Sequence, residues 1–360
     1  MSKIRETIDL IAPPDAVSMA EAQRIQDSLT KPRGSLGKLE ELSVRLAGIY
    51  RTRAPTIGRR MVFTMAADHG VTEEGVSAYP SEVTAQMVLN FAKGGAAINV
   101  LARASGAEVR VVDMGVKSDV EWPEPVISMK IAHGTKNMAR GPAMSEDEAR
   151  RGVEAGIELA FGACDDGVNA LAIGDMGIGN TTSASAITSL ITGRTAAEVT
   201  GRGTGIDDDV LNAKIRVVER AISVNSPDPS DGMDVLVKVG GLEIAGMAGV
   251  VLGASARGVP VFLDGFVSGT AGLIASTLCP ESRSYMIASH ISVEPGHRFL
   301  LDHIQLIPLL DLGMRLGEGT GAVLAFGMAD AACRILNEMA TFEGAGVARS
   351  VRSKQEEQVK

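Results

Sequence analysis

Five short runs of apolar, often β-branched residues constrain the fold of this chain more than any other feature. Each run ends in small or acidic residues: RMVFTMAADHG (60–70), EVRVVDMG (108–115), NALAIGDMG (169–177), VPVFLDG (259–265) and SYMIASH (284–290). Near-continuous apolar strands of this length are typical of a parallel sheet that is covered on both faces. Helical segments lie between the runs. The order βαβα therefore predicts an α/β fold with a doubly wound, mostly parallel, Rossmann-like sheet.

Helix boundaries are legible at several places. Ser18 with Glu21, and Ser145 with Glu148, fit the S-x-x-E capping box that closes the first turn of a helix. The long apolar stretch 245–263 contains an arginine, a proline and four glycines, so it predicts a helix, a turn and a buried strand and not a membrane span.

The domain organisation follows from the terminal segments. Residues 302–340 are expected to form two helices that are broken at a glycine cluster, and a further helix is expected from about Ser18 to Leu29. Together these predict a small helical domain built from both ends of the chain. The expected divisions are a large Rossmann-like catalytic domain over 30–300, a small helical domain of 1–29 with 301–348, and a flexible tail over 349–360.

Composition excludes several classes of function. The formal net charge is −9 and no long Lys/Arg tract is present, which disfavours nucleic acid and anionic membrane surfaces as partners. The three cysteines lie far apart without a CxxC pair, so neither a disulfide framework nor a zinc cluster is expected. The N-terminal region carries acids and two prolines, so no export signal is expected there. A reducing cytoplasm fits these features best.

A glycine-rich loop follows the third run. The segment GDMGIGNTTSASAI (174–187) combines glycines with Asn180, Thr181 and Thr182 before a helix of small residues. Glycines let backbone N–H groups approach an anion, and the helix adds the positive end of its dipole, so the segment predicts a phosphate site. The alternative is a tight turn with a hydroxyl cap. The segment is neither a Walker A loop nor a G-x-G-x-x-G motif.

A second glycine loop, GRGTGIDDD (201–209), resembles the first. Its acids are candidates either to cap the helix that starts near Asp208 or to bind ribose hydroxyls. Lys214 lies about one and a half turns into that helix. A lysine there is either solvated or points back toward a phosphate loop and supplies its positive charge.

The segment that follows the first run, 66–95, is rich in polar groups. Asp68 and His69 suggest a metal, but none of the five histidines pair at HxH or HxxxH spacing, so no metal site is expected. The residues Tyr79, Pro80, Gln86 and Met87 suggest the wall of a flat apolar pocket with one amide to orient a heterocycle. The alternative is a plain turn and a helix whose Val83, Met87 and Phe91 face the core. SVEPGH (292–297) and Asp264 also follow expected strands and either border the same cleft or are turn and cap residues.

The segment LGEGTGA (316–322) places one carboxylate, Glu318, between two glycines after an expected helix. A glycine within a helix costs about 1 kcal/mol relative to alanine, so folding alone does not favour three glycines around one acid. The pattern predicts a carboxylate that is held on closely approachable backbone.

Taken in order, these segments resemble the nicotinate-nucleotide:dimethylbenzimidazole phosphoribosyltransferase family. The resemblance runs through KPRGSLGKLEEL (31–42), ADHGV, YPSEVTAQM, GDMGIGNTT, GRGTG, LDGF, EPGH and MRLGEGTGA, which covers almost the whole chain. It implies transfer of the 5-phosphoribosyl group from nicotinate mononucleotide to 5,6-dimethylbenzimidazole, with inversion at C1′. The products are α-ribazole 5′-phosphate and nicotinate, for the nucleotide loop of cobalamin. It also implies a homodimer that uses no metal or other cofactor.

The resemblance also implies the roles of individual residues. Glu318 is the general base that takes the proton from the attacking benzimidazole. The remaining roles are Asp175, Gly177, Gly179, Asn180, Thr181 and Lys214 for the nucleotide and its phosphate, Gly203 and Gly205 for the ribose, and Tyr79, Pro80, Ser81, Gln86, Met87 and Leu316 for the acceptor base. One position departs from the family pattern, because Asp175 stands where Glu is common. Ser81 occupies a variable position of the YP-x-E segment, beside the base pocket.

Three other functions are weighed against this one. The first is a related enzyme that uses the same donor with adenine, another benzimidazole or a phenol. The second is a non-catalytic nucleotide-binding regulator, which has no need of the base Glu318. The third is a dinucleotide-dependent oxidoreductase, which predicts a G-x-G-x-x-G turn after the first strand, where this chain has AADHGV.

Overall fold

The computed structural model describes residues 2–348, which form two compact units. The first unit contains residues 2–13 and 58–326, and the second contains residues 14–57 and 327–348. These bounds differ from those of the expected domains: residues 30–57 join the helical unit, whereas 2–13 and 301–326 join the α/β unit. The tail expected over 349–360 lies outside the described residues.

The centre of the first unit is a six-stranded sheet whose pairings are all parallel, in the order β3-β2-β1-β4-β5-β6. The strands are β1 (Arg59–Ala67), β2 (Glu108–Gly115), β3 (Ile127–Ser128), β4 (Val168–Met176), β5 (Val261–Leu263) and β6 (Met286–Ala288). The order reverses between β1 and β4, which is the arrangement of a doubly wound nucleotide-binding sheet. The predicted fold class is therefore confirmed. The short edge strand β3 was not expected.

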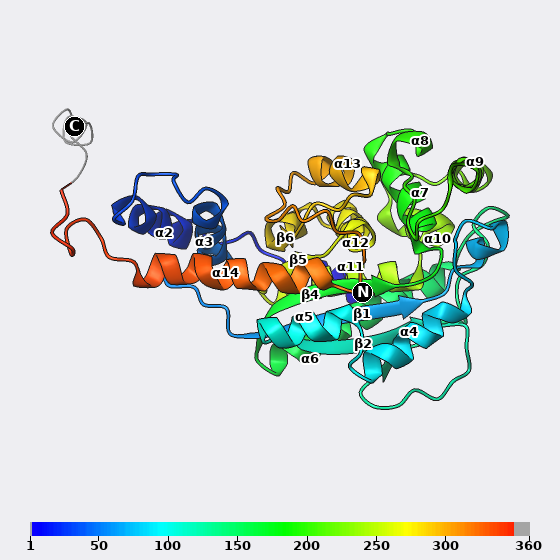
Figure 1. The fold of residues 1–360 in the computed structure, drawn as a ribbon, viewed down its shortest axis with the longest axis horizontal. Helices are drawn as coiled ribbons and strands as arrows, with labels where there is room; N and C mark the ends of the chain where they lie inside the picture. The colour runs from blue at the N-terminus through cyan, green and yellow to red at the C-terminus, as the bar shows by residue number, and fades with distance from the viewer. Residues whose placement is uncertain (1, 349–360) are drawn as a thin grey trace. The chain divides into compact units, whose positions relative to one another are not determined.

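Helices cover both faces of this sheet, and Figure 1 shows α4 and α5 along the β1 and β2 side of it. The helices of the first unit are α1 (Lys3–Asp9), α4 (Glu82–Ala92), α5 (Ala97–Ser105), α6 (Glu146–Asp165), α7 (Asn180–Thr192), α8 (Ala196–Val199), α9 (Asp208–Asn225), α10 (Gly232–Val239), α11 (Leu242–Ala256), α12 (Phe266–Leu278), α13 (Pro295–His303) and the first turns of α14 (Thr320–Glu338). Two 3-10 helices, η1 (Gly70–Glu74) and η2 (Pro280–Tyr285), complete the unit.

Side chains of the strands alternate between the two faces, as the period of two of a strand requires. Met65 of β1 points to α11, where its sulfur lies near Gly246. Its neighbour Thr64 points to the opposite face, where it hydrogen-bonds the turn before α14. On β5, Leu263 faces α12 and Phe262 meets Phe326 of α14, with ring centroids 4.8 Å apart. Each strand thus contributes apolar side chains to two layers, which explains why the strands read as continuous apolar runs.

Helices α6 and α11 pack closely because glycines face each other. A Cβ on Gly156 of α6 would overlap the carbonyl oxygen of Gly246, and a Cβ on Gly249 of α11 would overlap the carbonyl oxygen of Val153. Absent side chains thus let the two backbones touch. Part of the high glycine content, 41 residues, serves this helix interface and not turns.

The predicted helix starts are partly right. Ser145 and Glu148 form the expected capping box at the start of α6. Ser18 does not cap a helix: α2 (Ala16–Ser28) begins earlier, and Asp15 accepts a hydrogen bond of 2.7 Å from the Ser18 backbone N–H. The aspartate provides the same acceptor three residues upstream, so it replaces the serine as cap.

The helix expected over residues 302–316 is wrong. Helix α13 ends at His303, and the chain then runs without helix as far as Gly319. Pro308 cannot donate to a helical ladder, and the segment instead runs beside the extension of β6. The N–H groups of Leu309 and Leu310 donate to the carbonyls of Ala288 and Ser289 at 3.0 and 2.9 Å.

The second unit consists of helices α2 and α3 (Lys38–Ile49) and the later turns of α14, and Figure 1 shows α2 and α3 side by side. Ala22, Ala47 and Leu336 form its small apolar centre. Lys31 and Glu40 form a buried ion pair of 2.8 Å, and Glu40 also accepts hydrogen bonds from the backbone of the KPRGSLGKLEEL segment. This motif therefore has a structural explanation within its own unit.

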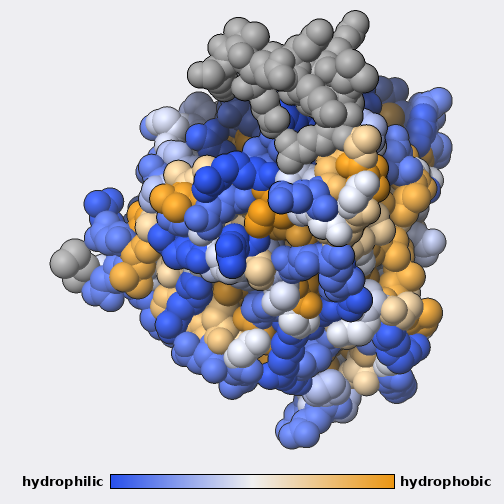
Figure 2. Space-filling model, turned by 90° about the vertical axis from the view of Figure 1, so that its left-hand side faces the viewer, coloured by the Kyte–Doolittle hydropathy of each residue, from blue (hydrophilic) through white to orange (hydrophobic). Residues whose placement is uncertain are grey.

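Surface polarity and helix length agree with the composition. Figure 2 shows a face on which hydrophilic residues dominate and apolar residues lie between them. Within residues 2–348, no helix combines the length and the apolar character needed to cross a membrane.

The glycine contact between α6 and α11 can be tested with two substitutions on one helix. Gly156→Ala is expected to lower the free energy of unfolding by about 1–3 kcal/mol, because the added methyl group forces the two backbones apart. Gly162→Ala on the same helix meets no atom within 4 Å and should be neutral or stabilising by up to about 1 kcal/mol. Urea unfolding measures both values. Equal effects of the two substitutions would contradict this account.

Candidate active site

Buried ionisable side chains collect where the parallel strands end. Asp68 follows β1, Asp175 lies near the end of β4, Asp264 follows β5 and His290 lies two residues beyond β6, and each is less than 9% exposed. The carboxyl ends of parallel strands meet at one edge of the sheet, which is where ligands bind in open α/β folds. This edge is therefore the place to look for a site.

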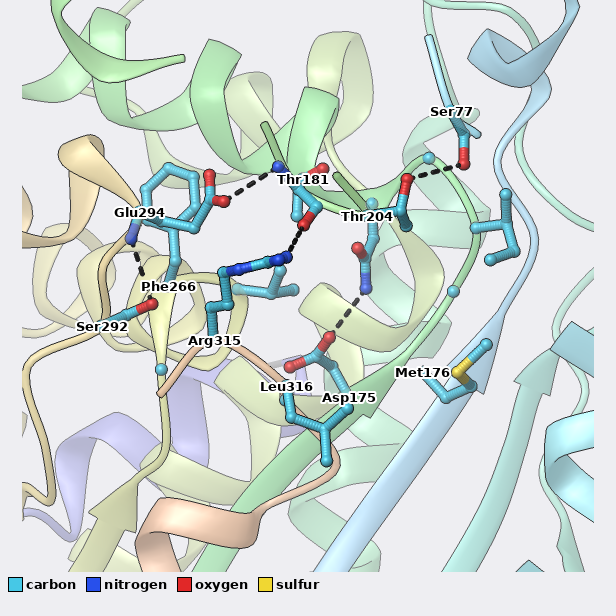
Figure 3. Close-up of a pocket in the computed structure, with 18 of the residues that line it drawn as sticks. Ser77, Asp175, Met176, Thr181, Thr204, Phe266, Ser292, Glu294, Arg315 and Leu316 are labelled. Atoms are coloured by element: carbon cyan, nitrogen blue, oxygen red, sulfur yellow. Dashed lines mark hydrogen bonds between the residues drawn. The ribbon is translucent and has the colours of Figure 1, made fainter. Parts of the chain in front are cut away.

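A pocket of about 310 Å³ opens at this edge (Figure 3). This volume lies at the lower end of the range for small-molecule sites. Its wall consists of Val76, Ser77, Tyr79, Asp175, Met176, Gly177, Ile178, Gly179, Asn180, Thr181, Gly203, Thr204, Gly265, Phe266, Val267, His290, Ser292, Glu294, Arg315, Leu316 and Gly317.

The loop between β4 and α7 forms one wall. Gly179 adopts φ +93° as the residue before α7, a conformation that favours glycine. Asn180, the first residue of the helix, donates from Nδ2 to Asp175 Oδ2 at 2.8 Å. The start of α7 thus faces the pocket, and the position is suited to an anion.

Asp175 has a strongly perturbed pKa. Burial raises the pKa of this carboxyl to about 8, and the nearby carboxylates of Asp264, Glu243 and Glu318 add to the effect, against the opposing hydrogen bond from Asn180. Protonation relieves both the desolvation and the repulsion. At neutral pH the neutral form of Asp175 therefore predominates.

Loop 201–205 forms the opposite wall and is held by hydrogen bonds to three other segments. Figure 3 shows Glu294, Arg315 and Thr204 in this part of the pocket. The Gly203 N–H donates to Glu294 Oε1 at 2.9 Å, and the Gly203 carbonyl accepts from Arg315 Nη1 at 2.6 Å. The hydroxyl of Thr204 accepts from the Ala78 N–H at 3.2 Å, which joins the loop to the segment before α4.

Lys214 of α9 contacts this loop from its buried side. Its side chain is buried, and the ammonium donates to Thr181 Oγ1 at 2.8 Å and to the Gly201 carbonyl at 3.3 Å. Burial lowers the pKa of Lys214 to about 8, against the opposing attraction of Glu294. The lysine is thus not a solvated surface residue. It bridges the two glycine loops and does not line the pocket.

Glu318 lies in a turn of unusual backbone geometry. Its φ is +64°, and the flanking Gly317 and Gly319 have φ +84° and +95°. A glutamate in the left-handed region is strained, so the surroundings must hold it there. The Glu318 N–H donates to the Asp175 carbonyl at 3.1 Å, and its carbonyl accepts from Thr64 Oγ1 at 2.8 Å.

The sheet accommodates this turn through Gly174 of β4. A Cβ at Gly174 would overlap the backbone of Glu318 and Gly319. A side chain on this face of the strand would therefore displace the turn. Gly174, the first glycine of the GDMG segment, therefore makes room for the Glu318 turn.

The Glu318 carboxylate is buried, and only one of its two oxygens accepts a hydrogen bond from the described residues. Oε2 accepts a hydrogen bond of 3.1 Å from the Ile98 N–H, in the first turn of α5. Oε1 has no hydrogen-bond partner among residues 2–348 and is not among their fully enclosed polar atoms. Burial and the charge of Asp264 raise the pKa of Glu318, against the opposing Ile98 N–H bond. A carboxylate with one accessible oxygen and a raised pKa is suited to accept a proton.

Asp264 fixes the end of the same turn. Its Oδ2 accepts from the Gly319 N–H at 3.1 Å, and its Oδ1 accepts from the Gly321 and Ala322 N–H groups at 2.6 and 3.1 Å. These are N–H groups at the start of α14, which lack partners within the helix. Asp264 is therefore a cap from a distant strand, and it does not line the pocket.

Asp68 and His69 are part of a buried polar cluster near the start of α7. His69 Nε2 lies 2.6 Å from Glu243 Oε1, and despite burial the Glu243 and Asp68 carboxylates raise the pKa of this imidazole. Asp68 Oδ2 accepts from the Lys117 N–H at 2.8 Å. Each side chain thus has a structural partner.

The structure brings eight of the fifteen predicted site residues to the pocket wall. These are Asp175, Gly177, Gly179, Asn180, Thr181, Gly203, Tyr79 and Leu316. Seven lie outside the wall: Glu318, Gly205, Lys214, Pro80, Ser81, Gln86 and Met87. In α4, the buried residues are Thr84, Val88 and Phe91, so Val83 and Met87 do not face the core as the alternative expected.

Several pocket residues were not singled out from the sequence. Arg315 directly precedes LGEGTGA, and Thr204 lies within GRGTG, but no local pattern distinguishes either from a surface residue. Glu294 and Ser292 belong to the SVEPGH segment, for which a place at the cleft was one of two alternatives, and both line the pocket.

Comparison with known proteins identifies the family of this chain. A family model described as phosphoribosyltransferase matches residues 11–347. The chain therefore belongs to this family of phosphoribosyltransferases.

The relatives name a particular enzyme. The nicotinate-nucleotide–dimethylbenzimidazole phosphoribosyltransferase of Chloroflexus aggregans is 58% identical over 96% of this chain and 98% of its own length. The protein of the same name from Roseiflexus sp. is 58% identical over 98% of this chain and 99% of its own length. The crystal structure of this phosphoribosyltransferase from Thermus thermophilus superposes with a TM-score of 0.89 at 46% identity, over 93% of this chain and 100% of that one.

The perturbed pKa of Asp175 predicts a pH dependence of stability. The folded state holds a proton on Asp175 that the unfolded state releases near its ordinary pKa of 3.8, so this contribution to stability is lost as pH rises toward about 8. The Asp175→Asn variant has no ionisable group at this position, so its stability should not show this loss as pH rises. Relative to the unaltered protein, the variant should therefore gain at least about 1 kcal/mol in free energy of unfolding between pH 5 and pH 8. Urea unfolding at both pH values measures the gain, and a constant difference would refute the assignment.

Proposed function

We propose that this chain transfers the 5-phosphoribosyl group of nicotinate mononucleotide to 5,6-dimethylbenzimidazole and releases nicotinate. The observation that carries the proposal is the Glu318 turn: a strained, buried glutamate with one free carboxylate oxygen directly follows Leu316 and Gly317 of the pocket wall. Full-length relatives at 55–58% identity carry the name of this activity.

The donor nucleotide is proposed to bind across the two glycine loops. Gly177, Gly179, Asn180 and Thr181 of the pocket wall present the start of α7 to the phosphate. Gly203 of the wall, with Gly205 two residues further on, is proposed to meet the ribose. Lys214 acts from behind the loops, where its ammonium holds Thr181 and Gly201 and adds positive charge. A neutral Asp175 at this place avoids repulsion of the donor phosphate.

The acceptor base is proposed to bind against Tyr79, Met176 and Leu316 of the pocket wall. Tyr79 and Leu316 are more than half exposed, so their apolar surfaces are available to a flat ring. Pro80 and Ser81 directly precede α4, and Gln86 and Met87 lie within it. These four residues are proposed to line the acceptor's approach.

The reaction requires proton removal and alignment more than acid catalysis. In the donor the nicotinate ring is a pyridinium, so it leaves C1′ with the bonding electron pair and becomes neutral at nitrogen. The incoming benzimidazole nitrogen forms the new bond to C1′ from the opposite face. The other ring nitrogen of the benzimidazole loses its proton to Glu318. The raised pKa of Glu318 makes it a stronger base than an ordinary glutamate.

The proposal extends to the setting of the enzyme. By family resemblance it acts as a homodimer in the cytoplasm and uses no metal or other cofactor. A magnesium-free assay of purified protein with nicotinate mononucleotide tests the reaction, with dimethylbenzimidazole, adenine, other benzimidazoles and phenols as acceptors. Chromatography and mass spectrometry follow nicotinate and the nucleotide product. Absence of product with every acceptor would overturn the proposal.

The role of Glu318 predicts a specific kinetic defect. Glu318→Gln keeps the Ile98 contact through its amide oxygen but cannot accept the proton, so kcat should fall by about 10²- to 10⁴-fold. The Kd of nicotinate mononucleotide, measured by calorimetry, should change little. Glu219→Gln, on the exposed side of α9, is the control and should leave both values unchanged. An unchanged kcat in Glu318→Gln would rule out its role as the base.

A further inference from the structure

Among the described residues, Arg315 is the only lysine or arginine that lines the pocket. The other ionisable groups in this wall are the acids Asp175 and Glu294, the phenol of Tyr79 and the imidazole of His290. His290 lies 3.6 Å from Asp264 and 3.1 Å from the Ile291 carbonyl, so its nitrogens already face acceptors. Arg315 is therefore the basic side chain that a ligand in this pocket meets.

The guanidinium of Arg315 has most of its hydrogen-bonding capacity unused. Among residues 2–348 it makes one hydrogen bond, from Nη1 to the Gly203 carbonyl, and no ion pair. A guanidinium presents five N–H donors in a planar fork that matches a carboxylate or a phosphate. The side chain of Arg315 is exposed and lines the pocket. Among the described residues, no carboxylate forms an ion pair with it.

Lys214, the cation expected from the sequence, cannot fill this role in the observed arrangement. Its ammonium is enclosed by Thr181 and Gly201, and a Cβ on Gly203 would lie 3.3 Å from Nζ. Gly203 lines the pocket and Lys214 does not. The lysine therefore supports loop 201–205 from its buried side, while Arg315 holds the same loop from the pocket side.

The position of Arg315 also connects the ligand to the Glu318 turn. Met314 accepts a hydrogen bond of 3.2 Å from the Val293 N–H, which fixes the segment just before Arg315. Glu318 follows three residues later, held by the Asp175 carbonyl and Thr64. A ligand anion bound by Arg315 would thus be tied to the turn that carries the proposed base and to the loop proposed to meet the ribose.

We infer that Arg315 binds an oxyanion of the donor nucleotide and is a specificity-determining residue of this enzyme. The inference rests on the proposed function. A nicotinate nucleotide carries two such anions, the 5′-phosphate and the ring carboxylate, and both match the guanidinium fork. Recognition of the carboxylate would select nicotinate over nicotinamide nucleotides. Recognition of the phosphate would select nucleotides over nucleosides.

A set of three ligands tests the inference by calorimetry. The Kd values of nicotinate mononucleotide, nicotinamide mononucleotide and nicotinate riboside are measured for the unaltered protein and for Arg315→Gln. The second ligand lacks the ring carboxylate and the third lacks the phosphate. Loss of a charged hydrogen bond to the full donor should raise its Kd at least about tenfold.

The pattern across the ligands identifies the anion. If Arg315 binds the carboxylate, the substitution should leave the Kd of the nicotinamide nucleotide unchanged within about twofold and weaken the other two. If it binds the phosphate, the nicotinate riboside should be the insensitive ligand. Either pattern supports the inference, because a residue that only positioned the loop would affect all three ligands equally.

Two control substitutions distinguish a direct contact of Arg315 with the ligand from a general effect of charge or of folding. Arg298→Gln removes a positive charge from exposed helix α13, outside the pocket wall, and should change each Kd by less than about twofold. Arg315→Lys keeps the charge but lacks the fork, so it should bind the full donor more weakly than the unaltered protein and more tightly than Arg315→Gln. Should Arg315→Gln unfold, the ligand comparison is made with Arg315→Lys.

Contrary outcomes are distinct from failure of the proposed function. An equal loss for all three ligands would mean that Arg315 only positions loop 201–205 through Gly203, and no loss for any ligand would remove it from the site. Both results overturn the inference and leave the proposed function standing. Failure of the unaltered protein to bind nicotinate mononucleotide would overturn both.

Discussion

The capping of α14 by Asp264 is the interaction on which the rest of the site depends. This carboxylate, fixed at the end of β5, accepts three N–H groups at the start of a helix that follows some 55 residues later in the chain. A negative charge at a helix N-terminus is stabilised by the helix dipole, and charged hydrogen bonds of this kind are stronger than neutral ones. The bond to Gly319 places the preceding residue, Glu318, against β4 and β1. The sheet therefore determines the position of the proposed base, although the base is carried by a turn.

Glycine works in this protein mainly through close approach of backbones. Gly174 lets the Glu318 turn lie directly on β4, and the glycines of α6 and α11 let two helices touch. The left-handed conformations of Gly317 and Gly319 complete the turn. The same property, the absence of a Cβ, thus packs the core on one face of the sheet and forms the site on the other.

The electrostatics of the site depend on burial. Asp175, Glu318 and Asp264 lie close together away from solvent, and their repulsion is relieved by raised pKa values at the first two and by the capped helix at the third. Burial also lowers the pKa of Lys214. Two groups that titrate near pH 8 therefore flank the loop between β4 and α7. The guanidinium of Arg315, with its planar fork of donors, is suited to a ligand anion.

The sequence by itself determined the fold class, because apolar runs that alternate with helices admit few arrangements other than a covered parallel sheet. It also determined the family, through long motifs in a fixed order, and it marked Glu318 and the β4–α7 loop, because glycines around a polar group have few other uses. Only the tertiary structure decided that residues 304–319 avoid a helix, since Pro308 removes a donor and the extension of β6 supplies other partners. It alone decided that Lys214 is enclosed while Arg315 faces the pocket, and that Asp264 caps a distant helix. These outcomes depend on which segments meet at the edge of the sheet, and contacts between residues far apart in the chain leave no signal in the local pattern.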